Sequence, residues 1–111
     1  MAKAPARPSV QQEVMKWITR LMQKRPSPAR AVMEAEAIAA DLRREGDEDQ
    51  VRSWLEEMRD GFAEASEQAA EAVDEVEATK KVERAAAENA AVCLREIGRT
   101  FGKALNAPVP A

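Results

Sequence analysis

The sequence predicts an all-α fold, either a helical hairpin or a four-helix-bundle-like arrangement with a long heptad-patterned third helix, and three observations support this. Apolar residues recur at three- and four-residue spacings along most of the chain. Alanine, the strongest helix former, supplies 23 of the 111 residues. Strand signals are nearly absent, because the chain has no Asn-Gly hairpin turn and no sustained alternation of β-branched residues. We therefore expect one all-helical domain over residues 10–105.

The first helix is predicted over residues 10–24, after a disordered basic arm at 1–9. The arm combines two prolines with alanine and basic residues, a composition that does not sustain a helix. The helix follows from an apolar stripe with helical spacing. Its members are Val10, Val14, Trp17, Ile18, Leu21 and Met22.

The second helix is predicted over 27–45, because its two ends carry recognisable signals. Ser27 is a favourable N-cap, and Pro28 suits the first helical position. Gly46 is expected to end the helix in the C′ position, which favours glycine. The prolines around this start mark the turn from the first helix.

The third helix, predicted over 48–77 with Asp47 as its N-cap, carries the clearest pattern in the chain. Eight apolar residues alternate between four- and three-residue spacings, which is a heptad seam. The second half of this seam is mostly alanine, so a partner helix can approach closely there. We expect this seam to be the oligomer contact. Its members are Val51, Leu55, Met58, Phe62, Ala65, Ala69, Ala72 and Val76.

The fourth helix is predicted over 80–105, followed by a disordered tail at 106–111. A new apolar stripe starts at Val82, out of phase with the heptad seam. Two shapes are compatible with this shift. Either the chain turns near residues 77–81, or one helix of about 87 Å, at 1.5 Å per residue, runs on in an oligomer.

The composition predicts a thin core and no catalytic apparatus. Alanine makes up nearly half of the 50 apolar residues and buries little area, so we expect self-association as a homodimer. The chain has no histidine, which excludes histidine general bases and imidazole metal ligands. Cys93 is the only cysteine, and we expect a buried structural thiol. No catalytic residue, metal or cofactor is therefore expected.

Charge is divided sharply along the chain, although the total is only −3. Residues 1–30 carry a net charge of +6, residues 31–78 carry −12, and residues 79–111 carry +3. The acidic part contains an ordered row on the third helix, spaced by three and four residues beside the heptad seam. We call it the acidic ridge and expect it to bind a basic protein surface. It consists of Glu57, Asp60, Glu64, Glu67, Glu71 and Asp74.

The basic residues near the N-terminus allow two interpretations. They could neutralise the acidic ridge within the chain, or they could contact nucleic-acid phosphates. No aromatic residues are interleaved with them as a stacking platform, so nucleic-acid binding is the alternative and not the main prediction. The basic patch consists of Lys16, Arg20, Lys24, Arg25 and Arg30.

We therefore predict a non-enzymatic helical regulator or inhibitor that occupies the surface of a partner protein. An anti-activator, a counter-defence inhibitor and a chaperone all fit this class. The alternative is a small DNA-binding or nucleoid accessory protein that acts through the basic arm and the first helix. The absence of a long apolar run predicts no membrane contact and a cytoplasmic location. The abundance of alanine, arginine and glutamate suggests a bacterial or phage origin.

Overall fold

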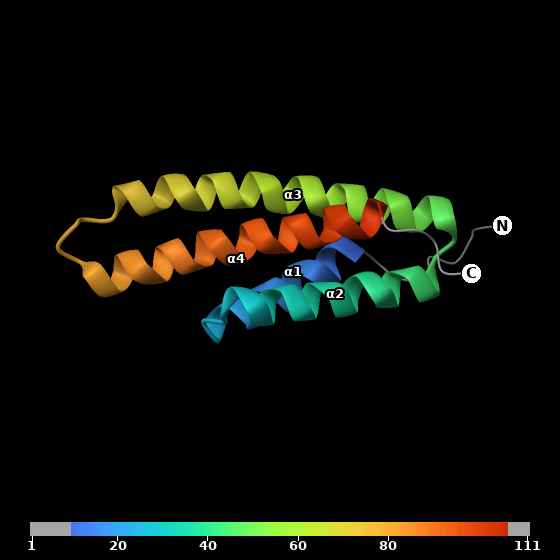
Figure 1. The fold of residues 1–111 in the computed structure, drawn as a ribbon, viewed down its shortest axis with the longest axis horizontal. Helices are drawn as coiled ribbons and strands as arrows, with labels where there is room; N and C mark the ends of the chain where they lie inside the picture. Colours follow the sequence, from blue (N-terminus) through green and yellow to red (C-terminus); the bar gives the residue numbers. More distant parts are fainter. Residues whose placement is uncertain (1–9, 107–111) are drawn as a thin grey trace.

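The computed structural model describes residues 10–106, which form four helices and, within that range, no strand. This confirms the predicted all-α fold. Successive helices run antiparallel and are joined by short turns (Figure 1). The predicted arm at 1–9 and residues 107–111 of the predicted tail lie outside the described residues, whereas Asn106, predicted to begin the tail, is helical. The helices are α1 (Val10–Gln23), α2 (Pro28–Glu45), α3 (Glu48–Glu75) and α4 (Lys81–Asn106).

The chain turns between α3 and α4, so of the two shapes that the sequence allows, the structure has the hairpin. Val76 leaves the helical conformation with φ −80° and ψ 130°. The guanidinium of Arg84, from α4, donates hydrogen bonds to the carbonyl oxygens of Val73 (3.3 Å) and Val76 (3.0 Å). The Val73 carbonyl also accepts a hydrogen bond from the Val76 amide (3.1 Å), so Arg84 is its second donor. At Val76, the Arg84 guanidinium supplies a donor for a carbonyl at the helix end, where backbone partners run out. The phase shift in the apolar pattern therefore marks a real end of the third helix.

The turn between α1 and α2 is fastened to α4. Arg25 adopts a left-handed conformation, with φ 49°, and reverses the chain. The carbonyl oxygen of Pro26 then accepts hydrogen bonds from the side-chain amide of Asn89 (2.8 Å) and from the Cys93 thiol (3.5 Å). Both donors lie on α4, so the α1–α2 pair meets α4 at the level of residues 89–93.

The predicted N-caps at Ser27 and Asp47 form, but Gly46 does not adopt the conformation that the sequence predicted. Its φ of −115° is extended backbone and not the left-handed C′ conformation that the sequence suggested. A Cβ atom at this position would lie 2.7 Å from the indole of Trp54. Glycine is therefore favoured here because the Trp54 ring packs over the backbone, and not because of a positive φ.

The core is built around α4, which packs closely against both α2 and α3. Ala31 and Ala35 are fully buried, so the backbone of α2 can approach α4. The Phe62 ring lies between two neighbours, with centroids 6.2 Å from Trp17 and 5.7 Å from Phe101. The buried cluster contains Val10, Val14, Ile18, Leu21, Ala31, Ala35, Ala39, Leu42, Val51, Leu55, Met58, Phe62, Cys93, Ile97 and Phe101.

The two halves of the molecule differ in thickness. The α1–α2 pair covers only part of the longer α3–α4 hairpin, whose turn projects beyond it (Figure 1). The molecule is elongated as a result, with extents of 57 × 30 × 21 Å. We call residues 68–88 the projecting hairpin, because they lie beyond the level at which Pro26 contacts α4. This part is two helices thick, whereas the rest is a four-helix bundle.

Candidate functional site

The heptad seam divides between the bundle and the projecting hairpin. Its first four residues are buried within the chain's own core. Ala65, Ala69 and Val76 are partly buried, and Ala72 is exposed. Val73 is the buried residue in this stretch instead. A straight helix drifts by about 20° per heptad against a strict seven-residue repeat, and this drift turns Val73 toward α4.

The acidic ridge lies along the outer side of α3, and all six of its carboxylates are exposed. The helical spacing places them on the side of α3 opposite Phe62, Ala65 and Ala69, so the ridge lies opposite the heptad seam and not beside it as expected from the sequence. No hydrogen bond or ion pair within residues 10–106 involves the carboxylates of Glu67 or Glu71. Both side chains therefore stand in solvent, Glu71 on the projecting hairpin and Glu67 one residue before it.

The other ridge carboxylates have weak or local contacts. Glu57 accepts a hydrogen bond of 3.1 Å from Gln11 on α1, whose side chain carries no charge. Asp60 pairs with the adjacent Arg59 at 2.9 Å. Asp74 lies 4.0 Å from Arg84, at the limit of an ion pair. Exposed contacts of this kind contribute little to stability, with typical values of about 0–1 kcal/mol.

The basic patch lies between α1 and α2 instead of on the ridge. Lys16, Arg20 and Lys24 line a shallow depression of about 390 Å³ with Trp17 and Glu34. In the described part of the chain, no ion pair joins these three side chains to the ridge. Arg25 is in the exposed α1–α2 turn, and Arg30 is on α2.

The positive charge of the basic patch acts on the carboxylate of Glu34. Its carboxylate accepts hydrogen bonds from Arg30 (2.8 Å) and from the indole of Trp17 (3.0 Å). These two bonds, and then the charges of Arg30 and Lys24, hold the pKa of Glu34 below its usual value against the opposing effect of burial. The positive charge of the N-terminal segment thus stabilises a carboxylate of α2, which the sequence pattern did not single out.

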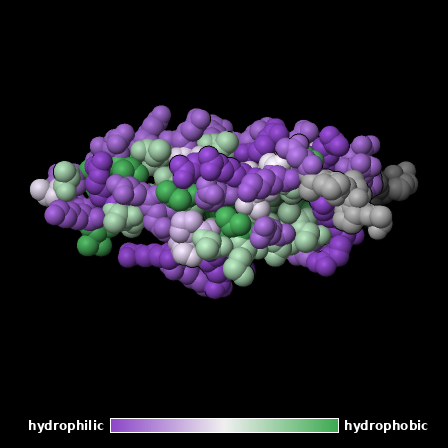
Figure 2. Space-filling model, viewed as in Figure 1, coloured by the Kyte–Doolittle hydropathy of each residue, from purple (hydrophilic) through white to green (hydrophobic). Residues whose placement is uncertain are grey.

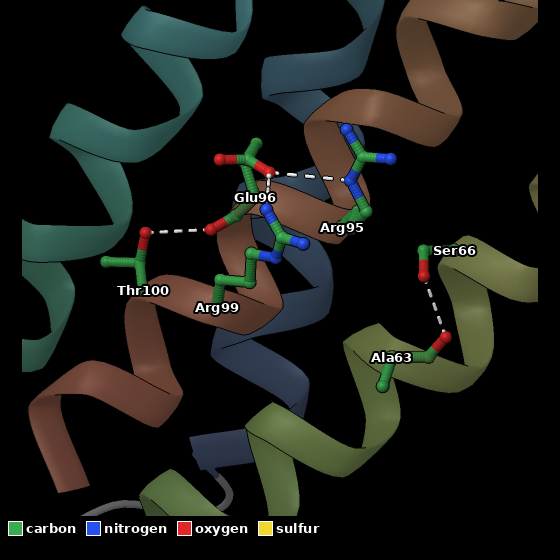
Figure 3. A network of polar contacts seen from close by, with 6 residues as sticks. All are labelled: Ala63, Ser66, Arg95, Glu96, Arg99 and Thr100. Carbon is green, nitrogen blue, oxygen red and sulfur yellow. Dashed lines mark hydrogen bonds and ion pairs between the residues drawn. The ribbon is translucent and has the colours of Figure 1, made fainter. Parts of the chain in front are cut away.

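A polar network on α4 provides a contrast with the ridge. Glu96 accepts contacts from Arg95 (3.4 Å) and Arg99 (3.2 Å), and its backbone carbonyl accepts a hydrogen bond from Thr100 (Figure 3). The carboxylate of Glu96 is flanked by cations on its own helix. The ridge has no such arrangement, because Arg59 and Arg84 are the only cations of residues 10–106 that approach it.

An apolar groove of about 780 Å³ opens between α2, α3 and the end of α4. Four cationic side chains line it, and the guanidinium of Arg43 donates a hydrogen bond to the carbonyl of Ala104. No sequence pattern predicted this groove, since its lining comes from three helices far apart in the chain. Its apolar lining includes Val32, Ala39, Val51, Leu55, Ala104 and Leu105.

The residues that could carry chemistry are few. Cys93 is fully buried, and burial raises the pKa of its thiol, which disfavours the reactive thiolate. Among residues 10–106, no group of three or more cysteine and carboxylate side chains is placed to hold a metal ion. In the same range, no helix is long and apolar enough to cross a membrane.

Comparisons of the chain with protein-family models, with curated proteins and with solved structures found no match. The geometry and charge of its own surfaces therefore carry the functional argument.

Proposed function

We propose that this chain is a non-enzymatic, homodimeric regulator that binds a basic surface of a partner protein through the acidic ridge of α3. By occupying that surface, the chain blocks the partner's activity or keeps the partner in one state. Anti-activators, counter-defence inhibitors and chaperones all work in this way, and all need only a helical scaffold with a charged face.

The observation that carries the proposal is the lack of an internal cation for the centre of the ridge. Glu67 and Glu71 are exposed and have no hydrogen-bond or ion-pair partner within residues 10–106. Like charges one helical turn apart cost about 0.2–0.5 kcal/mol per pair, so the ridge weakens the helix that carries it. A basic partner surface would offset that cost, and complementary charge would also speed its association.

The test is affinity capture from a lysate of the source organism with three baits. The baits are the wild type, a ridge variant and a control variant of equal charge. The ridge variant reverses Glu64, Glu67 and Glu71 to lysine. The control reverses Glu36, Asp41 and Glu48 to lysine, which are exposed carboxylates outside the ridge and away from the turn between α3 and α4.

The proposal predicts a protein that the wild type and the control retain and the ridge variant loses, with retention falling as salt rises. Equal capture by all three baits would contradict it. A salt-dependent mobility shift of duplex DNA by the wild type, with no such captured protein, would favour the nucleic-acid alternative. The ion pair of Arg30 with Glu34 does not support that alternative, because part of the basic patch is neutralised within the chain.

A further inference from the structure

We propose that the projecting hairpin docks against the projecting hairpin of a second copy of this chain, antiparallel and related by a twofold axis. The contact uses the side of the hairpin that α1 and α2 leave uncovered, which is opposite the acidic ridge. The inference rests on the self-association included in the proposed function, but not on ridge binding.

On this uncovered side, α3 and α4 each carry a row of residues that is buried further along the same helix, within the bundle. On α3 and its C-cap residue Val76, the positions of Ala69, Ala72 and Val76 extend the three- and four-residue spacing from Phe62, whose ring contacts α1 through Trp17. On α4, Val82 and Ala86 continue the line of Cys93 and Ile97, which are fully buried. Helices cover these lines in the bundle but not in the projecting hairpin. We call these five residues the uncovered face: Ala69, Ala72, Val76, Val82 and Ala86.

The uncovered face is apolar and open to solvent. Val82 is 76% exposed, the largest exposure among the large hydrophobic residues of the described chain. Ala72 is exposed, and the other three members are only partly buried. Figure 2 shows apolar atoms at the surface of the projecting end, among polar ones. Contact with another helix pair would remove this area from water.

A second copy fits this face in shape. Three of its five members are alanines, and short side chains at a contact allow another helix pair to approach closely. Two projecting hairpins laid antiparallel would form a short four-helix section, with each supplying the two helices that the other lacks. Between Asn89 and Lys81 the free part of α4 spans about 12 Å at 1.5 Å per residue, so the overlap is two to three helical turns. Such a contact is isologous and closes at two copies.

Charge fits the same arrangement. When the hairpins overlap fully, the tip of each one reaches the α1–α2 turn of the other. The turn presents Lys24 and Arg25, both exposed, and the tip presents three exposed carboxylates, those of Glu75, Glu77 and Glu83, beside the exposed side chains of Lys80 and Lys81. Lys81 lies two residues before Glu83, about 200° around α4, and therefore faces away from Glu83. The acidic side of each tip can then pair with the partner's basic turn.

The first test measures sedimentation of the wild type and two variants from micromolar to submillimolar concentration. The contact is short, so we expect a wild-type dimer that dissociates on dilution. Ala72→Glu places a charge in the contact and should raise the dissociation constant by about tenfold or more. Ala70→Glu adds the same charge at an exposed position of α3 outside the uncovered face and should leave the constant unchanged. Circular dichroism of both variants controls for folding.

The second test reverses the charges of the turn and the tip. A variant with Lys24→Glu and Arg25→Glu, and another with Glu75→Lys and Glu83→Lys, should each dimerise more weakly than the wild type. Mixed together, they should form a heterodimer, because each turn then meets a tip of opposite charge at both symmetric contacts. This recovery should weaken as salt rises.

The proposal is overturned if the wild type is monomeric throughout the range, if Ala72→Glu and Ala70→Glu behave alike, or if mixing restores nothing. These outcomes are separable from failure of the proposed function. The ridge variant should sediment as the wild type does, since its three substitutions lie outside the uncovered face. A monomeric wild type that still captures a protein through the ridge would overturn the dimer alone.

Discussion

At the scale of single residues, Glu34 shows how the positive charge of the N-terminal segment is used. Its carboxylate is reached by Trp17 from α1 and by Arg30 from its own helix. A carboxyl whose pKa is lowered by folding stabilises the folded state above its usual pKa. That contribution disappears as the pH falls through the lowered value. The pairing therefore stabilises the α1–α2 contact at neutral pH and not in acid.

Replacing Glu34 with glutamine removes the charge and leaves a hydrogen-bond acceptor for Trp17. We expect a lower melting temperature than that of the wild type at pH 7, with the difference shrinking as the pH falls below 4.5, the usual glutamate value. Thermal melts followed by circular dichroism at several pH values measure this. Glu36→Gln, two residues further along α2 at an exposed position, should show no such pH dependence. A difference that stays constant or grows in acid would contradict the assignment.

At the scale of helices, the spacing of α3 and α4 depends on a missing side chain. A Cβ atom at Gly98 would lie 3.3 Å from the Cβ of Phe62 and 3.4 Å from the backbone nitrogen of Ala63. The backbone of α3 cannot move aside without separating the two helices. Gly61 is a natural control, because a Cβ atom there would have no neighbour within 4 Å.

Gly98→Val should therefore destabilise the fold by about 1–3 kcal/mol, as overpacking of a core does. Gly61→Ala should stabilise it by about 0.5–1 kcal/mol, since alanine is the better helix former at an exposed position. Urea unfolding of the two variants beside the wild type measures both changes. Similar changes in the two variants would show that the close approach at Gly98 is not a constraint.

The heptad pattern of α3 predicted a long helix with an apolar side, but it did not show what covers that side. Periodicity gives the direction in which Phe62 points and carries no information on whether another helix of the same chain lies there. The pattern continued through Ala72, which is exposed, because α1 and α2 are too short to follow α3 to its end. Whether the apolar side of α3 is covered depends on the lengths of the neighbouring helices, and not on the spacing of apolar residues in α3.

The role of Arg84 could not be predicted from the sequence either. Its guanidinium holds the carbonyl ends of α3 from across the hairpin, eight to eleven residues along the chain. The phase shift after Val76 allowed either a turn or a continuous helix. Contacts between the Arg84 side chain and the backbone of α3 favour the turn. A pattern of apolar residues carries no information about such contacts.

At the scale of the whole molecule, the division of charge follows the division of shape. The positive N-terminal segment forms part of the thick bundle, and part of its charge acts on Glu34. The negative segment contains α3, whose ridge runs from the bundle along the projecting hairpin. The excess of negative charge thus extends onto the thinner end, where neighbouring helices are fewest. The ridge was predicted from its spacing, but whether the basic patch lay beside it depended on how α1 is rotated.

The central claim is that Glu64, Glu67 and Glu71 of the acidic ridge have no cationic partner within residues 10–106, and its most direct test is the melting temperature of the ridge variant. We expect reversal of Glu64, Glu67 and Glu71 to lysine to leave the melting temperature unchanged or to raise it, because repulsion along α3 is relieved. The effect should be largest at low salt, where charges are least screened. A fall in the melting temperature at low salt that recovers as salt rises would show that the ridge is neutralised inside the molecule, and would contradict the claim.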